Sequence, residues 1–144
     1  MTSAEEFKLR FCVVSTQQII WGDMDAFQHI NNTVYFRYFE NVRIDYFEKT
    51  GINRLMQSDN IGPILGATEC KYLAPLTFPD QIIIGTNVTQ IRDKRFSMDY
   101  EIFSTKLAKV AAKGSGEIIY FDYSANKTCE IPHVIREKIT TLSG

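Results

Sequence analysis

The sequence predicts an α+β domain in which an antiparallel sheet of about five strands wraps around one long central helix. Two observations carry this prediction. Residues 33–50 form a single long apolar segment between helix-capping residues, and residues 61–123 have the pattern of successive strands joined by short turns. Strands that follow one another after a single helix favour α+β over a doubly wound parallel sheet. Because the 144 residues contain no internal repeat and no linker, we expect one domain over residues 1–144.

The composition is that of an ordinary globular protein. Hydrophobic residues make up 44% of the chain and charged residues 23%, and 16 Lys and Arg against 17 Asp and Glu leave a net charge of −1. So balanced a charge argues against a nucleic-acid or membrane partner. The polar N-terminus is unlike a signal peptide, no apolar run reaches the length of a membrane span, and three widely spaced cysteines suit a reducing compartment. We therefore expect a cytoplasmic protein.

The first part of the chain divides into a strand, a loop and the long helix. A strand is expected within residues 7–20, which are rich in Phe, Val and Ile, and an ordered loop over residues 21–32, which combine a glycine with clustered Asp and Asn. The helix is expected from Thr33 to Thr50, because good N-cap residues open it and Gly51 is placed to end it. The N-cap candidates are Asn31, Asn32 and Thr33.

Apolar side chains cover much more than a narrow stripe of this helix. We therefore expect it to be enclosed on several sides, the alternative being an ordinary amphipathic surface helix. Its wetter face is marked by Glu40, Arg43 and Glu48. Such a helix suits the centre of a wrapped sheet.

After Gly51 the pattern predicts strands until a last helix. The first expected strand covers 61–73, broken at Gly62, Pro63 and Gly66, and a loop runs from Pro75 to Pro79. Strands over 81–91 and 95–103 are joined by a turn at 92–94, and a strand over 109–123 is bent at 114–116. A helix over 133–142 follows Pro132. With one helix for about five strands, much of the outer sheet face is left for a partner chain, so we expect an oligomer.

Residues that carry chemistry gather in the loop before the long helix. Asp23 and Asp25 lie there, followed by His29 and by the helix start at Asn31 and Asn32. A helix start offers unpaired backbone N–H groups and the positive end of the helix dipole, which suit developing negative charge. An acid held just before it can face a carbonyl whose oxygen rests on those groups, which is the apparatus for acyl transfer.

Motifs of other chemistries are missing from the sequence. It contains no nucleophile elbow, no dinucleotide-binding glycine motif and no P-loop. His29 and His133 lie far apart without metal-ligand spacing, so no metal site is expected. Cys12, Cys70 and Cys129 lie outside the loop, so a cysteine nucleophile has no support. Chemistry centred on a carboxylate remains.

The loop and the helix start resemble a known family. Residues 21–32, Trp-Gly-Asp-Met-Asp-Ala-Phe-Gln-His-Ile-Asn-Asn, followed by Tyr-Phe-Arg-Tyr-Phe-Glu at 35–40, resemble the start of hotdog-fold acyl-CoA thioesterases of the 4-hydroxybenzoyl-CoA thioesterase type. Weaker similarities at 71–76, 92–97 and 129–132 extend the resemblance over nearly the whole chain. The loop motif is quite specific, whereas the other three are useful only as a set.

The resemblance implies a hotdog fold and a homodimer or homotetramer with active sites at the subunit interface. It implies hydrolysis of an acyl-CoA or acyl-carrier thioester to a carboxylic acid and a free thiol; coenzyme A is part of the substrate, so no separate cofactor is expected. The implied catalytic residues are the acid Asp25, its neighbour His29 and the helix-start residue Asn32. The implied contacts to the coenzyme A phosphates are Arg92, Lys94 and Arg95. The segment 105–108, which joins the strands expected over 95–103 and 109–123, lacks the glycine common in the family, so the resemblance gives no exact position for this hairpin turn.

Several of these roles have alternatives. Asp25 acts as a nucleophile or as a general base on water, and its competing role is that of a carboxylate which only stabilises the loop. Asp23 is expected to be a turn residue, and His29 either assists catalysis or orients the loop and substrate. Glu40 is an alternative catalytic acid, since another branch of the family carries its catalytic acid on the central helix. The three basic residues also suit an ordinary solvated turn.

Two other functions compete with the thioesterase. An enoyl-thioester hydratase of the same fold also carries an acid and a histidine in this loop, but here the spacing is one residue too long and Ala26 replaces the expected proline. The second competing function is that of a module that binds an acyl-CoA or acyl carrier without turnover. The acid at Asp25 argues against it.

Overall fold

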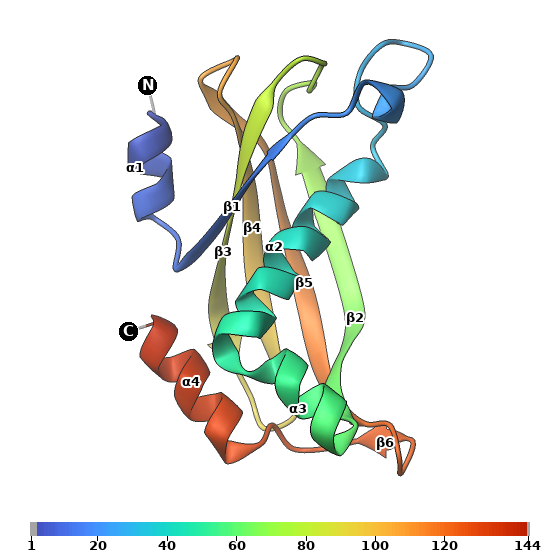
Figure 1. The fold of residues 1–144 in the computed structure, drawn as a ribbon, viewed down its shortest axis with the longest axis vertical. Coiled ribbons are helices and arrows are strands. Elements are labelled where there is room, and N and C mark those ends of the chain that lie inside the picture. The colour runs from blue at the N-terminus through green and yellow to red at the C-terminus, as the bar shows by residue number, and fades with distance from the viewer. Residues whose placement is uncertain (1–2, 144) are drawn as a thin grey trace.

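The protein is a helix wrapped by a sheet. In the computed structural model, which describes residues 3–143, helix α2 (Val34–Thr50) lies along the concave side of a curved antiparallel sheet (Figure 1). The sheet order is β1 (Val13–Gln18), β3 (Gln81–Ile91), β4 (Arg95–Ser104), β5 (Lys109–Asp122) and β2 (Ile61–Tyr72), and β6 (Lys127–Thr128) pairs with the end of β5. The predicted α+β fold, with its strands wrapped around one long helix, is confirmed.

Helix α2 is the centre of the core. Gly51 ends it in the left-handed conformation, with a φ of 82°, which glycine adopts without a Cβ clash. Buried side chains occupy much of its circumference, as expected for an enclosed helix. Glu40 and Glu48 are exposed as predicted, but Arg43 is buried, so its place on the wetter face is wrong. Its guanidinium turns inward and donates a hydrogen bond to the hydroxyl of Tyr100.

The sequence pattern does not reveal two shorter helices. α1 (Ala4–Leu9) forms in the polar N-terminal segment, where the Ser3 hydroxyl accepts a hydrogen bond from Glu6 N at 3.1 Å. α3 (Ile52–Asp59) follows α2 directly, so the expectation of strands immediately after Gly51 is wrong. One left-handed residue ends a helix and redirects the chain, and here the next helix starts from that same residue.

The later strands and the last helix lie close to their predicted bounds, but β1 begins at Val13, so the strand predicted from residue 7 is wrong at its start, where α1 forms. β2 runs unbroken past Gly62 and Pro63, so the interruption predicted there is wrong, but its register with β5 shifts between Leu65 and Ala67, at the predicted Gly66. The proline is tolerated because β2 is an edge strand, where one row of backbone groups needs no partner. α4 (His133–Ser143) follows Pro132 as predicted.

Close packing between α2 and the sheet depends on a glycine of β5. Phe39 of α2 stacks on Tyr100 of β4, with ring centroids 4.8 Å apart. A Cβ on Gly114 would lie 2.4 Å from the Phe39 ring and 2.6 Å from the backbone oxygen of Glu69. Residues 113–117 pair in register with both neighbouring strands, so no bulge accompanies the bend predicted there. The position needs glycine because the helix lies so close to the strand.

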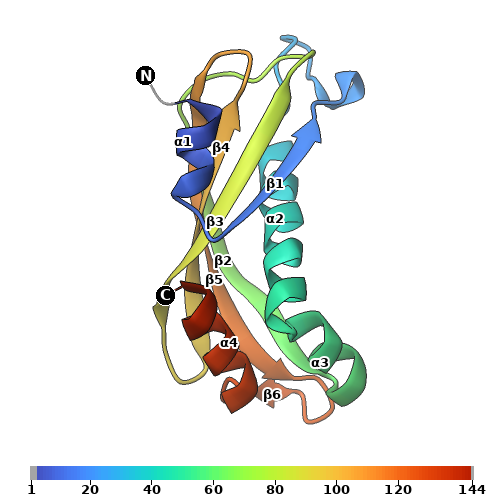
Figure 2. The same ribbon diagram turned by 60° about the vertical axis from the view of Figure 1, so that its left-hand side comes forward.

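The outer face of the sheet is partly covered by α1. Phe7 packs there with Ile83 and Phe103 in a second, smaller core cluster, and Figure 2 shows α1 on the opposite side of the sheet from α2. Arg10 fastens this segment through hydrogen bonds of 2.8 and 3.2 Å to the two carboxylate oxygens of Glu101. Part of the face that we expected to need a partner chain is therefore covered by the chain itself.

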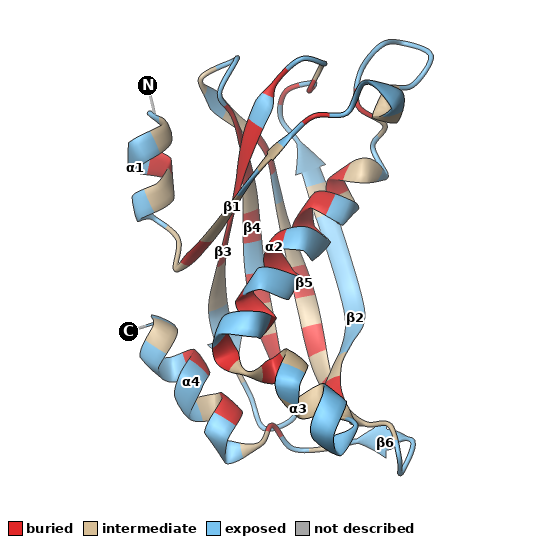
Figure 3. Cartoon of the chain, viewed as in Figure 1, coloured by how far each residue is buried: buried red, intermediate tan, exposed pale blue. Residues whose placement is uncertain are grey.

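The least covered strand is β2. Figure 3 shows it mostly exposed, whereas β3, β4 and α2 carry many buried residues. Ile64 and Leu65 are among its exposed apolar side chains. The backbone edge of β2 is therefore available for pairing with another strand. No helix within residues 3–143 is long and apolar enough to cross a membrane.

Candidate active site

The loop before α2 is ordered by its own backbone. It begins with a short 3-10 turn (Trp21–Asp23). Asp25 N then donates to His29 O at 2.8 Å and closes the loop. Ile30 N donates to Leu76 O at 2.8 Å, which ties the loop to the segment after β2. The ordered loop that its glycine and its Asp and Asn residues predict is confirmed.

Asp25 is held in place with one carboxylate oxygen free. Its Oδ1 accepts a hydrogen bond from Phe27 N at 2.9 Å, the local turn that loop aspartates commonly form. Within the described residues the other oxygen accepts no hydrogen bond. Asp25 is exposed and, together with His29 and Asn32, lines an open depression of about 350 Å³. The structure therefore brings the three predicted catalytic residues to one surface.

The N-cap residue of α2 is Thr33, and Asn31 makes the hydrogen bonds of the turn directly before it. The Asn31 Oδ1 accepts hydrogen bonds from Thr33 N at 2.9 Å and from Thr33 Oγ1 at 2.8 Å, and the Asn31 carbonyl oxygen accepts one from Val34 N at 3.0 Å. Of the three N-cap candidates, Thr33 occupies the N-cap position without a side-chain capping hydrogen bond, and Asn31 binds the N–H of Thr33. The N–H of Asn32 makes no hydrogen bond to another residue in the described part of the chain. Asn32 is also one of the residues that line the depression.

The back of the depression comes from the end of β2 and the segment after it. Tyr72 packs edge-on against Tyr35 of α2, with ring centroids 4.8 Å apart, and its hydroxyl donates to Asn32 O at 2.9 Å. The Tyr35 hydroxyl accepts from Leu76 N at 3.3 Å, and burial raises the pKa of Tyr35. The other lining residues are Ile30, Leu73, Ala74 and Pro75. Tyr72 is a site residue that the sequence does not predict, although the similarity at 71–76 contains it.

The two other carboxylates considered for catalysis lie elsewhere. Asp23 contributes its backbone, which donates to Ile20 O and accepts from Asn31 N, both at 3.0 Å, and it does not line the depression. Glu40 is exposed on α2 and lines a different groove. Among the residues that the structure describes, no three His, Cys, Asp or Glu side chains gather closely enough to hold a metal ion.

The predicted phosphate-binding residues lie at the other end of the sheet. They are Arg92, Lys94 and Arg95. The turn between β3 and β4 that carries them is at the bottom of Figure 1, whereas the loop before α2 is at the top. This turn packs against the segment that leads into α4, where Ile131 N donates to Asp93 O at 2.9 Å. A single chain therefore does not bring these cations to Asp25.

A long helix wrapped by a curved antiparallel sheet, with an acid-bearing loop that runs into the helix start, defines a hotdog-fold protein of the thioesterase class. The model of the Thioesterase-like superfamily matches residues 19–139, which include the loop, α2 and every strand except β1. The chain belongs to this superfamily, so the resemblance to hotdog thioesterases is confirmed.

Named relatives and solved structures agree with this family. The chain is 23% identical over 116 residues to the long-chain acyl-CoA thioesterase FadM of Escherichia coli, a match over 81% of this chain and 88% of that protein. It is 25% identical over 96 residues to protein YsmA of Bacillus subtilis, where the match spans under two thirds, 64%, of the relative. A thioesterase from Thermus thermophilus, crystallised with coenzyme A and Zn, is 25% identical, with a TM-score of 0.82 over 93% of this chain and 96% of that one.

Proposed function

We propose that the protein hydrolyses acyl-CoA thioesters to a carboxylic acid and free coenzyme A. The observation that carries the proposal is that Asp25, which keeps one carboxylate oxygen free, and Asn32, whose N–H bonds to no described residue, line one open depression. A thioester carbonyl bound there would turn its carbon toward the acid and rest its oxygen on the helix-start donor. Thioesterases among the similar proteins support the same reaction class.

Two routes fit these groups. In the first, Asp25 attacks the carbonyl carbon, the carbon–sulfur bond breaks, and the thiolate of coenzyme A leaves and takes up a proton; water then hydrolyses the mixed anhydride and restores the carboxylate. In the second, Asp25 takes a proton from water as the water oxygen attacks the same carbon, and the departing thiolate is protonated in turn. In both, the Asn32 N–H stabilises the oxyanion, and His29, which lines the same depression, orients the substrate.

Thiol release from a panel of short, long and aromatic acyl-CoAs tests the proposal. We expect hydrolysis far above background for at least one of these classes, and no hydration of crotonyl-CoA. Saturable coenzyme A binding without thiol release from any substrate would favour a binding module. Hydration of crotonyl-CoA would favour an enoyl-thioester hydratase, and either result would overturn the proposal.

Replacement of Asn31 by alanine is expected to lower the free energy of unfolding by about 1 kcal/mol, because its two hydrogen bonds from Thr33, the N-cap residue of α2, are lost. Turnover should fall by roughly 10- to 100-fold, because the helix-start donor shifts relative to the acid. Chemical denaturation and steady-state kinetics measure the two effects. Asn31→Asp keeps the side-chain acceptor and should retain most of the stability and most of the turnover. Full activity in a destabilised Asn31→Ala protein would show that the hydrogen bonds between Asn31 and Thr33 do not position the Asn32 N–H.

We propose that the active unit is a homodimer joined through β2. The strand offers a free edge of 12 residues at one side of the sheet. Exposed apolar side chains on the strand and beside it are Ile44, Ile64, Leu65, Tyr72 and Leu73. A twofold axis that pairs identical strands makes them antiparallel, so the Tyr72 end of each β2 would lie near the Ile61 end of its partner. The partner's basic turn would then approach the end of the sheet that carries Asp25.

A lysine at the middle of β2 is expected to weaken this dimer by at least about tenfold in dissociation constant. Ala67 is exposed near the centre of the strand, where a twofold axis would bring the two copies of the residue together. Within its own chain Ala67 is paired with Glu117, so Ala67→Lys adds no repulsion to the folded monomer. Sedimentation or light scattering over a range of concentrations measures the effect. Val134→Lys, on exposed α4, is the control; equal association of both variants would exclude β2 as the interface.

Loss of the basic turn is expected to weaken substrate binding without slowing the chemical step. The double variant Arg92→Ala with Lys94→Ala should raise KM by about tenfold at low salt and leave kcat nearly unchanged, because phosphate contacts act equally on substrate and transition state. Arg95 is left in place, since its guanidinium lies 3.7 Å from the Glu117 carboxylate. Kinetics at several salt concentrations measure the change against Lys138→Ala. An unchanged KM would leave the turn without a role in binding.

A further inference from the structure

Arg43 lines a groove that shares no lining residue with the depression at Asp25. The groove lies between α2, α3 and the first half of β2 and has a volume of about 260 Å³. Its lining residues are Glu40, Arg43, Ile44, Phe47, Asn53, Met56, Pro63, Leu65 and Ile118. Arg43 is only 8% exposed, whereas Glu40 is exposed at the rim. A cation thus lies at the base of walls that are mainly apolar.

The guanidinium of Arg43 has very little compensation within the chain. Its Nη1 donates to the neutral hydroxyl of Tyr100 at 3.1 Å, and its central carbon lies 5.9 Å from the centre of that ring. It forms no ion pair with a carboxylate of the described residues. A guanidinium carries five N–H donors, and a buried charge is costly unless an opposite charge and hydrogen bonds compensate it. The arrangement therefore favours an anion in the groove.

We infer that this groove binds the carboxylate end of an acyl group, so that the preferred substrates are thioesters of dicarboxylic acids. A carboxylate is planar and pairs with a guanidinium through two parallel hydrogen bonds, whereas a methyl end would leave the charge of Arg43 uncompensated. The apolar walls suit the methylene chain before that end. This inference rests on the proposed function, because it specifies the acyl group of the same substrate.

The proposed dimer explains how one acyl group reaches both features. Pro63 and Leu65, which line the groove, lie in the half of β2 that begins at Ile61. Antiparallel pairing of the two β2 strands would bring the Tyr72 end of the partner, with its depression, beside this half. The acyl group held at the partner's Asp25 would therefore extend toward Arg43 of the first chain.

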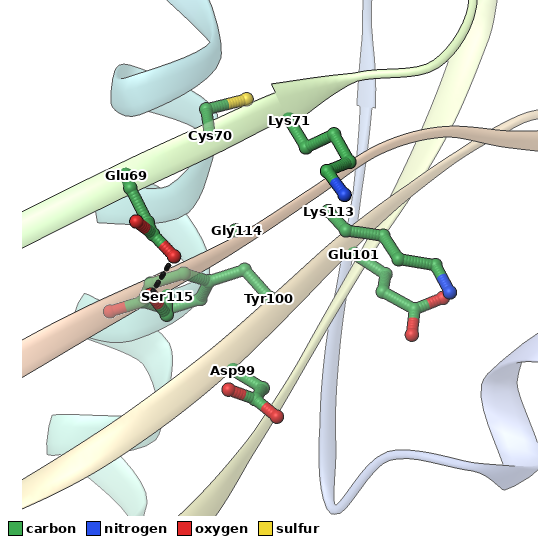
Figure 4. A pocket seen from close by; sticks show the side chains of 9 residues that line it. All are labelled: Glu69, Cys70, Lys71, Asp99, Tyr100, Glu101, Lys113, Gly114 and Ser115. Atoms are coloured by element: carbon green, nitrogen blue, oxygen red, sulfur yellow. Dashed lines mark hydrogen bonds between the residues drawn. The ribbon is translucent and has the colours of Figure 1, made fainter.

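A second hollow, on the outer face of the sheet, does not offer a comparable site. Figure 4 shows side chains of both charges around it, among them Glu69, Asp99, Lys71 and Lys113. Burial and the nearby carboxylate of Glu101 raise the pKa of Asp99. Its charged residues are exposed or half-buried and of mixed sign, so the hollow has no buried charge that would bind a ligand of opposite charge.

Hydrolysis of matched substrate pairs tests the inference. Adipoyl-CoA and suberoyl-CoA, with free terminal carboxylates, are compared with hexanoyl-CoA and octanoyl-CoA of equal length. We expect the wild type to favour the carboxylate-ended member of a pair by at least about tenfold in kcat/KM, and Arg43→Met to abolish that preference. Arg43→Lys, which keeps the charge, should retain part of it. Arg37→Met, which replaces another arginine of the same helix, is the matched control.

Binding of free suberate provides a readout that needs no turnover. Titration calorimetry or NMR on the Asp25→Asn protein should detect suberate binding that Arg43→Met removes and Arg37→Met retains. Suberate binding of this kind in a protein that hydrolyses no thioester would overturn the proposed function and keep the groove. Normal hydrolysis with no preference within the pairs and no suberate binding would overturn the groove and keep the thioesterase. Should Arg43→Met not fold, the charge-keeping Arg43→Lys and the wild-type preference decide the matter.

Discussion

Replacement of Asp25 by asparagine is expected to lower kcat for acyl-CoA hydrolysis by roughly 10²- to 10⁴-fold. In both proposed routes the carboxylate is the nucleophile or the base, and a neutral amide is neither. The fold should survive, because asparagine keeps the side-chain oxygen that accepts the Phe27 N–H. Thiol release at saturating substrate measures kcat, and circular dichroism with thermal melting establishes that the variant is folded.

Asp23→Asn is the matched control for this experiment. Asp23 lies two residues earlier in the same loop, but it contributes its backbone and does not line the depression. Its variant should therefore keep most of the wild-type turnover. If Asp25→Asn stayed active while Glu40→Gln lost activity, the catalytic acid would lie on α2, and the assignment of the acid to the loop would be wrong.

Replacement of Phe39 by alanine is expected to lower the free energy of unfolding by about 3–5 kcal/mol, a large part of the stability of a domain of this size. Phe39 is fully buried, stacks on Tyr100 with ring centroids 4.8 Å apart, and covers Gly114. Truncation removes this contact area and leaves a cavity where α2 meets the sheet. Urea unfolding at one fixed protein concentration measures the loss, since association also contributes to stability.

Phe27→Ala serves as the control, because this phenylalanine is 82% exposed and its truncation should cost little. A double-mutant cycle then tests the contact itself. Gly114→Ala alone forces a Cβ to within 2.4 Å of the Phe39 ring, so its cost should be smaller in the Phe39→Ala background. Additive costs would show that the ring and the glycine do not restrict each other.

Local signals account for the parts of the fold that the sequence predicts well. The long helix has a run of apolar residues, a turn at Asn31 directly before it and a terminating glycine at Gly51, and all three act within a few residues of the chain. The same locality explains one failure. Gly51 ends α2, but only the packing of Ile52 and Leu55 against the core shows that a new helix begins at once.

Arg43 shows where sequence patterns fail for a single side chain. An arginine between Val42 and Ile44 on an apolar helix is expected to face water, because a buried charge is costly. Its burial depends on Tyr100, a residue of β4 far along the chain, which supplies a hydroxyl and a ring face to the guanidinium. Periodicity along one helix carries no information about such a partner.

The candidate site likewise combines residues that are close together in the sequence with one residue that only the fold brings near them. Asp25, His29 and Asn32 lie within one short segment, which the family resemblance singled out as catalytic, and the depression brings them to one surface. Tyr72 joins them only because β2 returns beside the start of α2, where its hydroxyl binds Asn32 O.

The sequence by itself therefore determined the extent of the long helix and the acid loop, because both depend on interactions between residues close together in the chain. It also determined the class of fold, because the succession of one long helix and several strands is visible along the chain. Only the tertiary structure decided that β1 and β2 are the edge strands, that the basic turn lies at the opposite end of the sheet from Asp25, and that Arg43 is buried. These features depend on how the sheet orders its strands and curves around α2. That order is a property of contacts between distant segments, which no local pattern encodes.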